Sequence, residues 1–163
     1  MAIIKLNIDD FDTVDYSLFA IHTNLADFRL AYFINKQLNL QLIKNNNDIA
    51  ISDNKNEVLF TNFIYNYDHN ATEWTLFENK KTITVVSKMS STINLFSDNN
   101  DLNIQKTIYL MPEFKNVNYF LKINHNDAID TQQIIVGINN IIQVNTAYYI
   151  DTANIKNKNN LIF

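Results

Sequence analysis

The sequence predicts an α+β fold, in which two helices pack on one face of a mostly antiparallel sheet. Alternating apolar and polar residues dominate 40–111, which is typical of an antiparallel meander. Apolar residues recur at helical spacing in 24–38 and 127–141, which predicts two amphipathic helices. Because each helix lies between strand-like segments, two β-α-β segments flank the meander, and both helices are expected on the same sheet face.

Short stretches of period-two or wholly apolar sequence predict the strands. Segment 14–22 has apolar residues on both faces, which is typical of a central strand. Asparagine runs such as Asn45-Asn46-Asn47 are expected to form turns, because asparagine tolerates the left-handed backbone region. The predicted strands are 2–8, 14–22, 40–44, 48–52, 57–67, 73–78, 82–88, 92–96, 104–111, 117–123 and 144–151.

The first helix is predicted to begin after Thr23 or Asn24, either of which can cap it. Asp27 lies in its first turn, where a negative charge suits the helix dipole. Arg29 and Lys36 lie together on the side opposite its apolar stripe. The residues expected in that stripe are Leu25, Phe28, Ala31, Tyr32, Ile34 and Leu38.

The second helix is predicted to begin at Asp127, with Asp130 as an acceptor three residues later. Gly137 lies in its interior, where close packing against the sheet would account for it, although a ligand approaching the backbone is the alternative. The order of elements fits a ferredoxin-like split β-α-β plan with an inserted meander. The expected buried stripe is Ile134, Ile135, Ile138, Ile141 and Ile142.

Length and composition indicate one domain over 1–163, because the chain has no repeat and no linker rich in Pro, Gly or Ser. Residues 152–160 form a polar tail that ends in Leu161-Ile162-Phe163. Since termini fray unless they are held, we expect these last residues to dock. The domain's own core is the favoured site, and a partner's groove is the alternative.

Composition excludes several kinds of chemistry. The chain has no cysteine, so thiolate catalysis and cysteine-based metal sites are excluded. Gly137 is the one glycine, which excludes phosphate-binding loops and the G-x-S-x-G elbow. Arg29 is the one arginine and the net charge is −4, which disfavours nucleic-acid binding. Nothing in the sequence calls for a cofactor or assigns a catalytic residue.

No metal site is predicted. His22, His69 and His125 lack the spacing of a zinc motif, and solvated or hydrogen-bonded histidines are the simpler interpretation. The acids Asp9, Asp10, Asp12 and Asp15 could hold a hard cation, but an acidic turn is the simpler interpretation. Acids follow the first strand too early for a signal peptide, and no apolar run is long enough to span a bilayer. We therefore expect a cytoplasmic protein that binds no membrane.

The most distinctive segment runs from Met111 to Ile123 and holds the chain's one proline, Pro112, followed by Glu113. Pro112, Glu113, Val117 and Tyr119 resemble the signature of the IPExxxVDY family, although Met111 stands in place of isoleucine and Asn118 in place of aspartate. The resemblance extends to Ala20–His22, Asp27–Tyr32 with Asn35, and Asn159–Phe163. It implies a small single-domain bacterial protein and no particular activity.

Within this pattern, five residues are candidates for a binding or structural motif: Arg29, Asn35, Pro112, Glu113 and Tyr119. Glu113 is expected either to pair with Arg29, which would hold the first helix to the motif strand, or to be exposed and unpaired. Asn35 is either a buried amide bonded to backbone or a ligand contact, because buried amides need partners.

Three functions remain open from the sequence. The leading hypothesis is a non-enzymatic protein that acts as a homodimer or binds another cytoplasmic protein, through an exposed aromatic patch that draws on Tyr65, Tyr67, Trp74 or Tyr149. The alternative is a small-molecule-binding domain with a pocket between sheet and helices, polar at Asn35, Glu113 or Tyr119. An enzyme with Glu113 as a general acid or base comes third.

Overall fold

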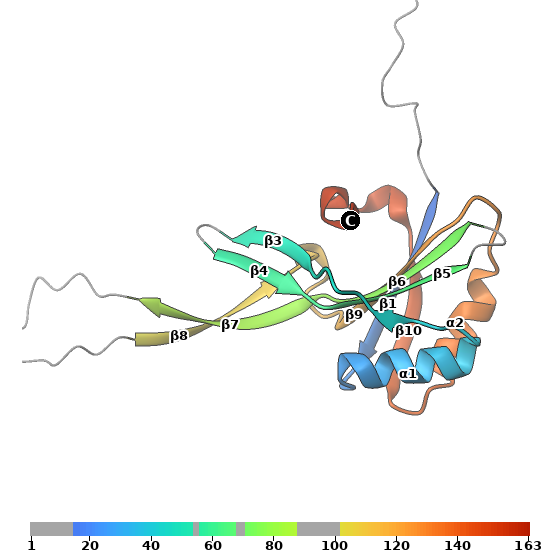
Figure 1. Ribbon diagram of the computed structural model, residues 1–163, viewed down its shortest axis with the longest axis horizontal. Coiled ribbons are helices and arrows are strands. Elements are labelled where there is room, and N and C mark those ends of the chain that lie inside the picture. The colour runs from blue at the N-terminus through green and yellow to red at the C-terminus, as the bar shows by residue number, and fades with distance from the viewer. Residues whose placement is uncertain (1–14, 54–55, 68–70, 88–101) are drawn as a thin grey trace, which may run out of the picture.

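The computed structural model describes residues 15–53, 56–67, 71–87 and 102–163, the coloured parts of Figure 1. The predicted strands 2–8 and 92–96 therefore lie outside the described residues. The same holds for His69 and for Asp9, Asp10 and Asp12.

A six-stranded sheet forms the centre of the molecule, and every neighbouring pair of its strands is antiparallel. The predicted α+β class is thereby confirmed. In spatial order the strands are β10 (Val144–Ile150), β1 (Tyr16–Thr23), β9 (Tyr119–Asn124), β6 (Thr72–Glu78), β5 (Asn62–Tyr67) and β2 (Ile43–Lys44).

Two helices connect strands of this sheet and cover one of its faces (Figure 1). Helix α2 (Thr131–Asn139) links β9 to β10, which lie on either side of β1, so this crossover skips one strand. Helix α1 (Asp27–Leu38) follows β1, and the chain returns to the sheet through β2, β5 and β6. The ferredoxin-like plan stays a prediction.

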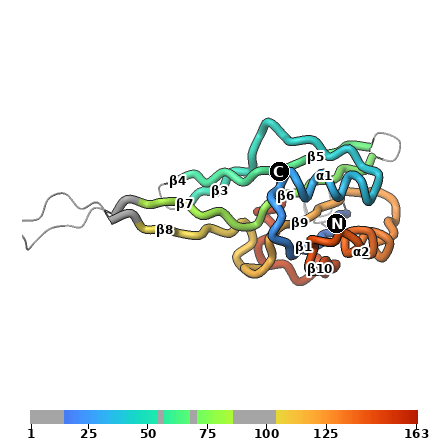
Figure 2. The backbone as a smooth tube through the Cα atoms, turned by 90° about the horizontal axis from the view of Figure 1, so that it is seen from below, coloured from blue at the N-terminus to red at the C-terminus, as the bar shows by residue number. Residues whose placement is uncertain are grey.

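Two hairpins extend from the sheet on the side away from the helices, as Figures 1 and 2 show. One pairs β3 (Ile49–Asp53) with β4 (Asn56–Phe60), and the other pairs β7 (Lys80–Ser87) with β8 (Leu102–Tyr109). The single strand predicted over 57–67 is thus divided at Thr61 between the β3–β4 hairpin and the main sheet. The Lys106 ammonium pairs with the Asp53 carboxylate and ties the two hairpins together.

The sheet is buried on both faces, which explains the apolar sequence of β1. On the helix face, Phe19, Leu121 and Ile123 pack against Leu30 and Ile34 of α1 and against α2. On the opposite face, a second core joins the sheet to both hairpins and to the C-terminal segment. Its fully buried large side chains are Leu18, Phe60, Phe77, Leu110, Met111 and Phe120.

The helices are shorter than predicted and their caps differ. Helix α1 begins at Asp27 after Ala26, which provides no side-chain cap, so capping by Thr23 or Asn24 is wrong. Helix α2 begins at Thr131, because the Asp130 carboxylate accepts the backbone N–H of Gln133 and caps this turn in place of Asp127. Helix α1 ends at Leu38 and is followed by Asn39, which adopts φ 54° in the left-handed region.

The buried face of each helix also differs from the predicted stripe. Phe28 and Tyr32 were expected in the core but are 64% and 61% exposed. Helix α1 buries Ala31 and Ile34, as predicted, together with Leu30, which was not in the predicted stripe. Ile142, placed in the stripe of the second helix, lies beyond the end of α2 and is exposed. Two large aromatic side chains of α1 are therefore available on the surface.

Gly137 was predicted to pack against the sheet, but its nearest neighbours are Leu38 and Gln37 of α1. A Cβ atom built on Gly137 would lie 2.4 Å from Leu38 Cδ2, which is closer than two carbon atoms can approach. The absence of a side chain thus lets α2 lie close to the end of α1. Any other residue at this position would have to displace the tip of the Leu38 side chain.

Candidate functional site

The motif segment Leu110–Asn118 is held in place by Asn79, a fully buried residue between β6 and β7. The Asn79 side chain donates to the carbonyls of Phe114 and Val117, at 2.8 and 3.1 Å, and accepts the N–H of Met111 at 2.8 Å. Its backbone bonds the same segment through the N–H of Leu110 and the carbonyl of Asn118. Asn79 carries no distinguishing sequence signal, since it is one of many asparagines.

Pro112 and Glu113 connect this segment to the C-terminal part of the chain. Pro112 begins a single turn of 3-10 helix (Pro112–Phe114), for which its fixed φ is suited. The Glu113 carboxylate accepts the backbone N–H groups of Lys156 and Asn157 at 3.0 to 3.2 Å. Glu113 therefore anchors the tail, and the interpretation of an exposed, unpaired Glu113 is wrong.

The predicted pairing of Glu113 with Arg29 is also wrong. Arg29 is exposed on α1, and the ion pairs of the described residues are Lys81–Glu78 and Lys106–Asp53. The geometry explains this, because α1 covers one face of the sheet while Glu113 holds a tail that covers the other (Figure 1). Arg29, the one arginine of the chain, thus has no ion-pair partner among the described residues.

The tail docks on the sheet through its last residues. Leu161 is 2% exposed, and the Phe163 ring packs edge-on against Phe77 at a centroid distance of 5.2 Å. Asn160 donates from its amide to the carbonyl of Leu110 at 2.7 Å. Ile162 points away from this core and is largely exposed.

Lys122, on the sheet beneath the tail, is buried without an ion pair within the described residues. Its ammonium donates to the carbonyl of Leu161 at 2.7 Å and lies 4.9 Å from the centre of the Phe163 ring and 5.5 Å from that of Tyr16. Burial lowers the pKa of Lys122, and the nearby charge of Glu73 opposes this effect. The carbonyl and the rings thus replace part of the hydration that the ammonium loses.

Asn35 forms a clamp on the chain that follows its helix. Its amide donates to the carbonyl of Leu42 at 3.0 Å and accepts the N–H of Leu42 at 2.8 Å. Asn139 near the end of α2 clamps Ala147 of β10 in the same way, at 2.9 and 2.8 Å. Of the two interpretations of Asn35, the structure thus shows a backbone-bonded amide. The two clamps lie at opposite edges of the sheet.

Tyr119 lies at the start of α1, on the helix face of the sheet. Its hydroxyl donates to the carbonyl of Leu25 at 2.9 Å. Asn118 beside it accepts the backbone N–H of Thr23 at 3.1 Å, a role that an aspartate oxygen could equally fill. Burial, and then the charges of Asp27 and Glu78, raise the pKa of Tyr119 to about 12.

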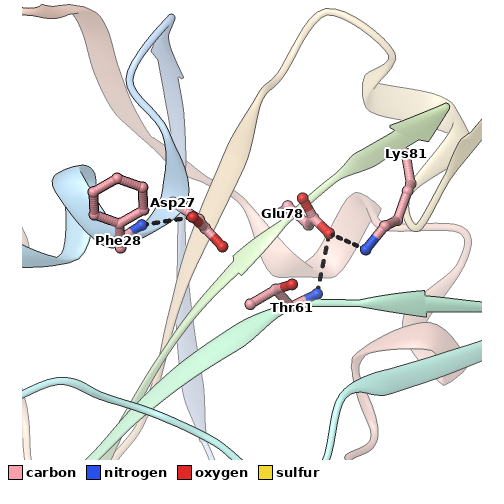
Figure 3. A network of polar contacts seen from close by, with 5 residues as sticks. All are labelled: Asp27, Phe28, Thr61, Glu78 and Lys81. Atoms are coloured by element: carbon pink, nitrogen blue, oxygen red, sulfur yellow. Dashed lines mark hydrogen bonds and ion pairs between the residues drawn. The ribbon is translucent and has the colours of Figure 1, made fainter.

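Asp27 and Glu78 flank this tyrosine from different elements. Glu78 accepts the N–H of Thr61 at 3.1 Å and pairs with Lys81 at 3.2 Å, and the Asp27 carboxylate accepts the N–H of Phe28 at 2.7 Å (Figure 3). The described residues contain no group of three or more acidic or histidine side chains that could hold a metal ion. The Glu78 contacts hold the end of β6 to Thr61 and Lys81, and the Asp27 contact lies in the first turn of α1.

A pH-dependent stability follows from Tyr119. Between pH 10 and about 12 the unfolded chain loses the phenol proton while the folded chain keeps it, so stability falls as pH rises through this range. We expect Tyr119→Phe to cost about 1 kcal/mol at pH 8, from the lost hydrogen bond, and this difference to shrink toward pH 11. Urea unfolding of both proteins from pH 8 to 11 measures this. A difference that is constant with pH would contradict it.

The five motif candidates therefore do not converge on one site. Tyr119 and Arg29 lie near α1, Asn35 clamps Leu42 at the far end of that helix, and Pro112 and Glu113 hold the tail on the other face. The aromatic residues proposed for a patch are also divided. Tyr65, Tyr67 and Trp74 line a hollow of about 290 Å³ beside Leu40, whereas Tyr149 lies on the edge strand β10.

No known protein family matches the chain, and no curated protein or solved structure shows significant similarity to it. The resemblance to the IPExxxVDY family stays a prediction. None of the described helices is long and apolar enough to cross a membrane.

Proposed function

We propose that the protein is a non-enzymatic interaction module, and that it binds an acidic protein segment through the outward face of α1. Phe28 and Tyr32 support this proposal most directly, because two aromatic rings one helical turn apart are more than half exposed. Isolated apolar side chains on a surface are ordinary, but paired aromatic rings are typical anchors of protein interfaces.

The charges beside these rings favour an acidic partner. Arg29 and Lys36 are exposed on the same outward side of α1, and neither forms an ion pair within the described residues. The one acid of α1, Asp27, is directed toward Glu78 and away from this face (Figure 3). An acidic segment with apolar side chains would match both the rings and the cations.

The same charges disfavour self-association through this face. In a two-fold dimer the same patch occupies both sides of the interface, so two copies of Arg29 and Lys36 would meet. A membrane surface fits less well, because two cations contribute little attraction and the whole chain carries a net charge of −4. A binding partner other than a second copy is therefore the form of the interaction hypothesis that the geometry supports best.

Selection of 16-residue peptides from a random library against the purified protein tests this proposal. We expect the enriched peptides to combine acidic with apolar residues, and their affinity to fall about tenfold or more when Phe28 and Tyr32 are both changed to alanine. Arg29→Glu together with Lys36→Glu should weaken binding similarly, because each lost charge contact contributes on the order of 1 kcal/mol.

Ile142→Ala is the matched control, since Ile142 is the most exposed apolar side chain of the described residues but lies outside α1. It should leave peptide affinity unchanged, and all these surface variants should unfold at nearly the same urea concentration as the wild type. Peptides that bind the alanine variant as well as the wild type would contradict the proposal. So would light scattering that shows a dimer dissociated by the two charge reversals.

A further inference from the structure

A pocket of about 400 Å³ lies on the sheet face opposite the helices and plays no part in the proposed protein contact. Its floor is formed by side chains of β5 and β6, among them Asn62 and Glu73, and one wall by β3 and the loop before it. The other wall is the end of the tail, Asn159–Phe163, which Glu113 and Leu161 hold in place. The volume lies within the range of small-molecule sites.

Asn62 in this pocket is 1% exposed, and its hydrogen bonding is incomplete. The amide nitrogen donates to the carbonyl of Asn47 at 2.9 Å, which fixes the orientation of the side chain. The carbonyl oxygen Oδ1 is then left buried without a partner among the described residues. Since buried acceptors are nearly always bonded, this atom points to a donor supplied from the pocket.

The charged groups of the lining are both acidic. Asp48 and Glu73 line the pocket, no lysine, arginine or histidine does, and neither acid forms an ion pair within the described part of the chain. One oxygen of Glu73 accepts the Asn124 amide at 3.0 Å. Lys122 lies near enough to Glu73 to sense its charge, but its ammonium is held by the Leu161 carbonyl outside the lining.

Apolar side chains complete the pocket, chiefly Ile49, Ile51 and Ile64. We propose that this pocket binds a small aliphatic ammonium compound. The ammonium group donates to the carboxylates of Asp48 and Glu73 and to Oδ1 of Asn62, and the alkyl body contacts the isoleucines. A cation with several N–H donors can bond more than one of these acceptors, which neither an anion nor a purely apolar ligand can do.

Calorimetric titration with three four-carbon compounds tests the charge preference. We expect 1,4-diaminobutane to bind measurably at millimolar concentration or below, 1,4-butanediol to bind at least about tenfold more weakly, and succinate not to bind. In NMR spectra the side-chain amide signals of Asn62 should shift with the diamine. The proposal would be overturned if the diamine failed to bind even at about tenfold above millimolar concentration, or if diol and diamine bound equally. It would also be overturned if the Asn62 amide signals showed contact with a bound water and did not shift when the diamine was added.

Charge-removing variants locate the binding. Glu73→Gln keeps an oxygen for the Asn124 amide but removes the charge, and Asp48→Asn does the same at the pocket wall. Each should weaken diamine binding about five- to tenfold. Glu57→Gln removes the same charge from an exposed position on β4 outside the pocket and should have no such effect. An equal loss in all three variants would show only nonspecific attraction to an acidic protein and would overturn the proposed site.

Discussion

Replacing Asn79 by alanine is expected to lower the free energy of unfolding by about 3–5 kcal/mol. The substitution leaves two buried backbone groups of the motif segment, the N–H of Met111 and the carbonyl of Val117, without a partner, and it leaves the carbonyl of Phe114 bonded only to the N–H of Val117. An unsatisfied buried group costs about 1–3 kcal/mol, and alanine also leaves a cavity. Urea unfolding followed by tryptophan fluorescence measures the loss, since the chain has one tryptophan.

Two further variants separate hydrogen bonding from volume. Asn79→Asp has nearly the same shape, but its carboxylate would face the carbonyls of Phe114 and Val117 and cannot donate to them at neutral pH. It should therefore destabilise at least as much as alanine, and less at acidic pH, where the protonated acid can donate once. Asn66→Ala on the exposed side of β5 is the control and should stay within about 0.5 kcal/mol. Equal effects at positions 66 and 79 would contradict the prediction.

Deleting residues 161–163 is expected to destabilise the fold by about 3 kcal/mol or more. The deletion exposes the apolar surface that Leu161 and Phe163 cover, including Phe77, and it removes the carbonyl that accepts from Lys122. Lys122 then becomes hydrated, which offsets part of the loss. For a chain of this size the melting temperature should fall by roughly 6–12 °C, which differential scanning calorimetry detects.

Single substitutions in the tail provide a matched comparison. Leu161→Ala should cost about 2–4 kcal/mol because the Leu161 side chain is buried. Ile162→Ala should change the free energy of unfolding by less than about 0.5 kcal/mol because the Ile162 side chain is largely exposed. An unchanged melting temperature on deletion would mean that the tail does not dock on its own domain and would favour a partner's groove. Equal effects at positions 161 and 162 would also contradict self-docking.

Much of the strand content could be predicted from sequence, because alternation of side chains follows directly from the geometry of a strand. All ten described strands overlap predicted segments, with the difference that one predicted segment is divided at Thr61. The order of strands could not be predicted, since pairing depends on contacts distant in sequence. The second core could not be predicted either, because it is built from the sheet, both hairpins and the tail, which lie far apart in the sequence.

The buried face of α1 was mispredicted for a related reason. Aromatic and aliphatic residues occur all around this helix, so hydrophobicity alone does not show whether Phe28 or Leu30 faces the sheet. Of the site residues, Glu113 was singled out from the sequence, but both interpretations of it were wrong because its partners are backbone N–H groups, which carry no sequence signal. Asn79 and Asn62 could not be distinguished from other asparagines, because their roles follow from burial alone.

The paired asparagine clamps have a consequence for the behaviour of the chain at high concentration. Outer strands of a sheet offer unbonded peptide groups on which further strands can add, and this chain is rich in strand-forming sequence. At Leu42 and Ala147 a side-chain amide already occupies both the N–H and the carbonyl, as an added strand would do. A side chain from each helix thus blocks strand addition at one edge of the sheet, and the sheet cannot polymerise through these peptide groups.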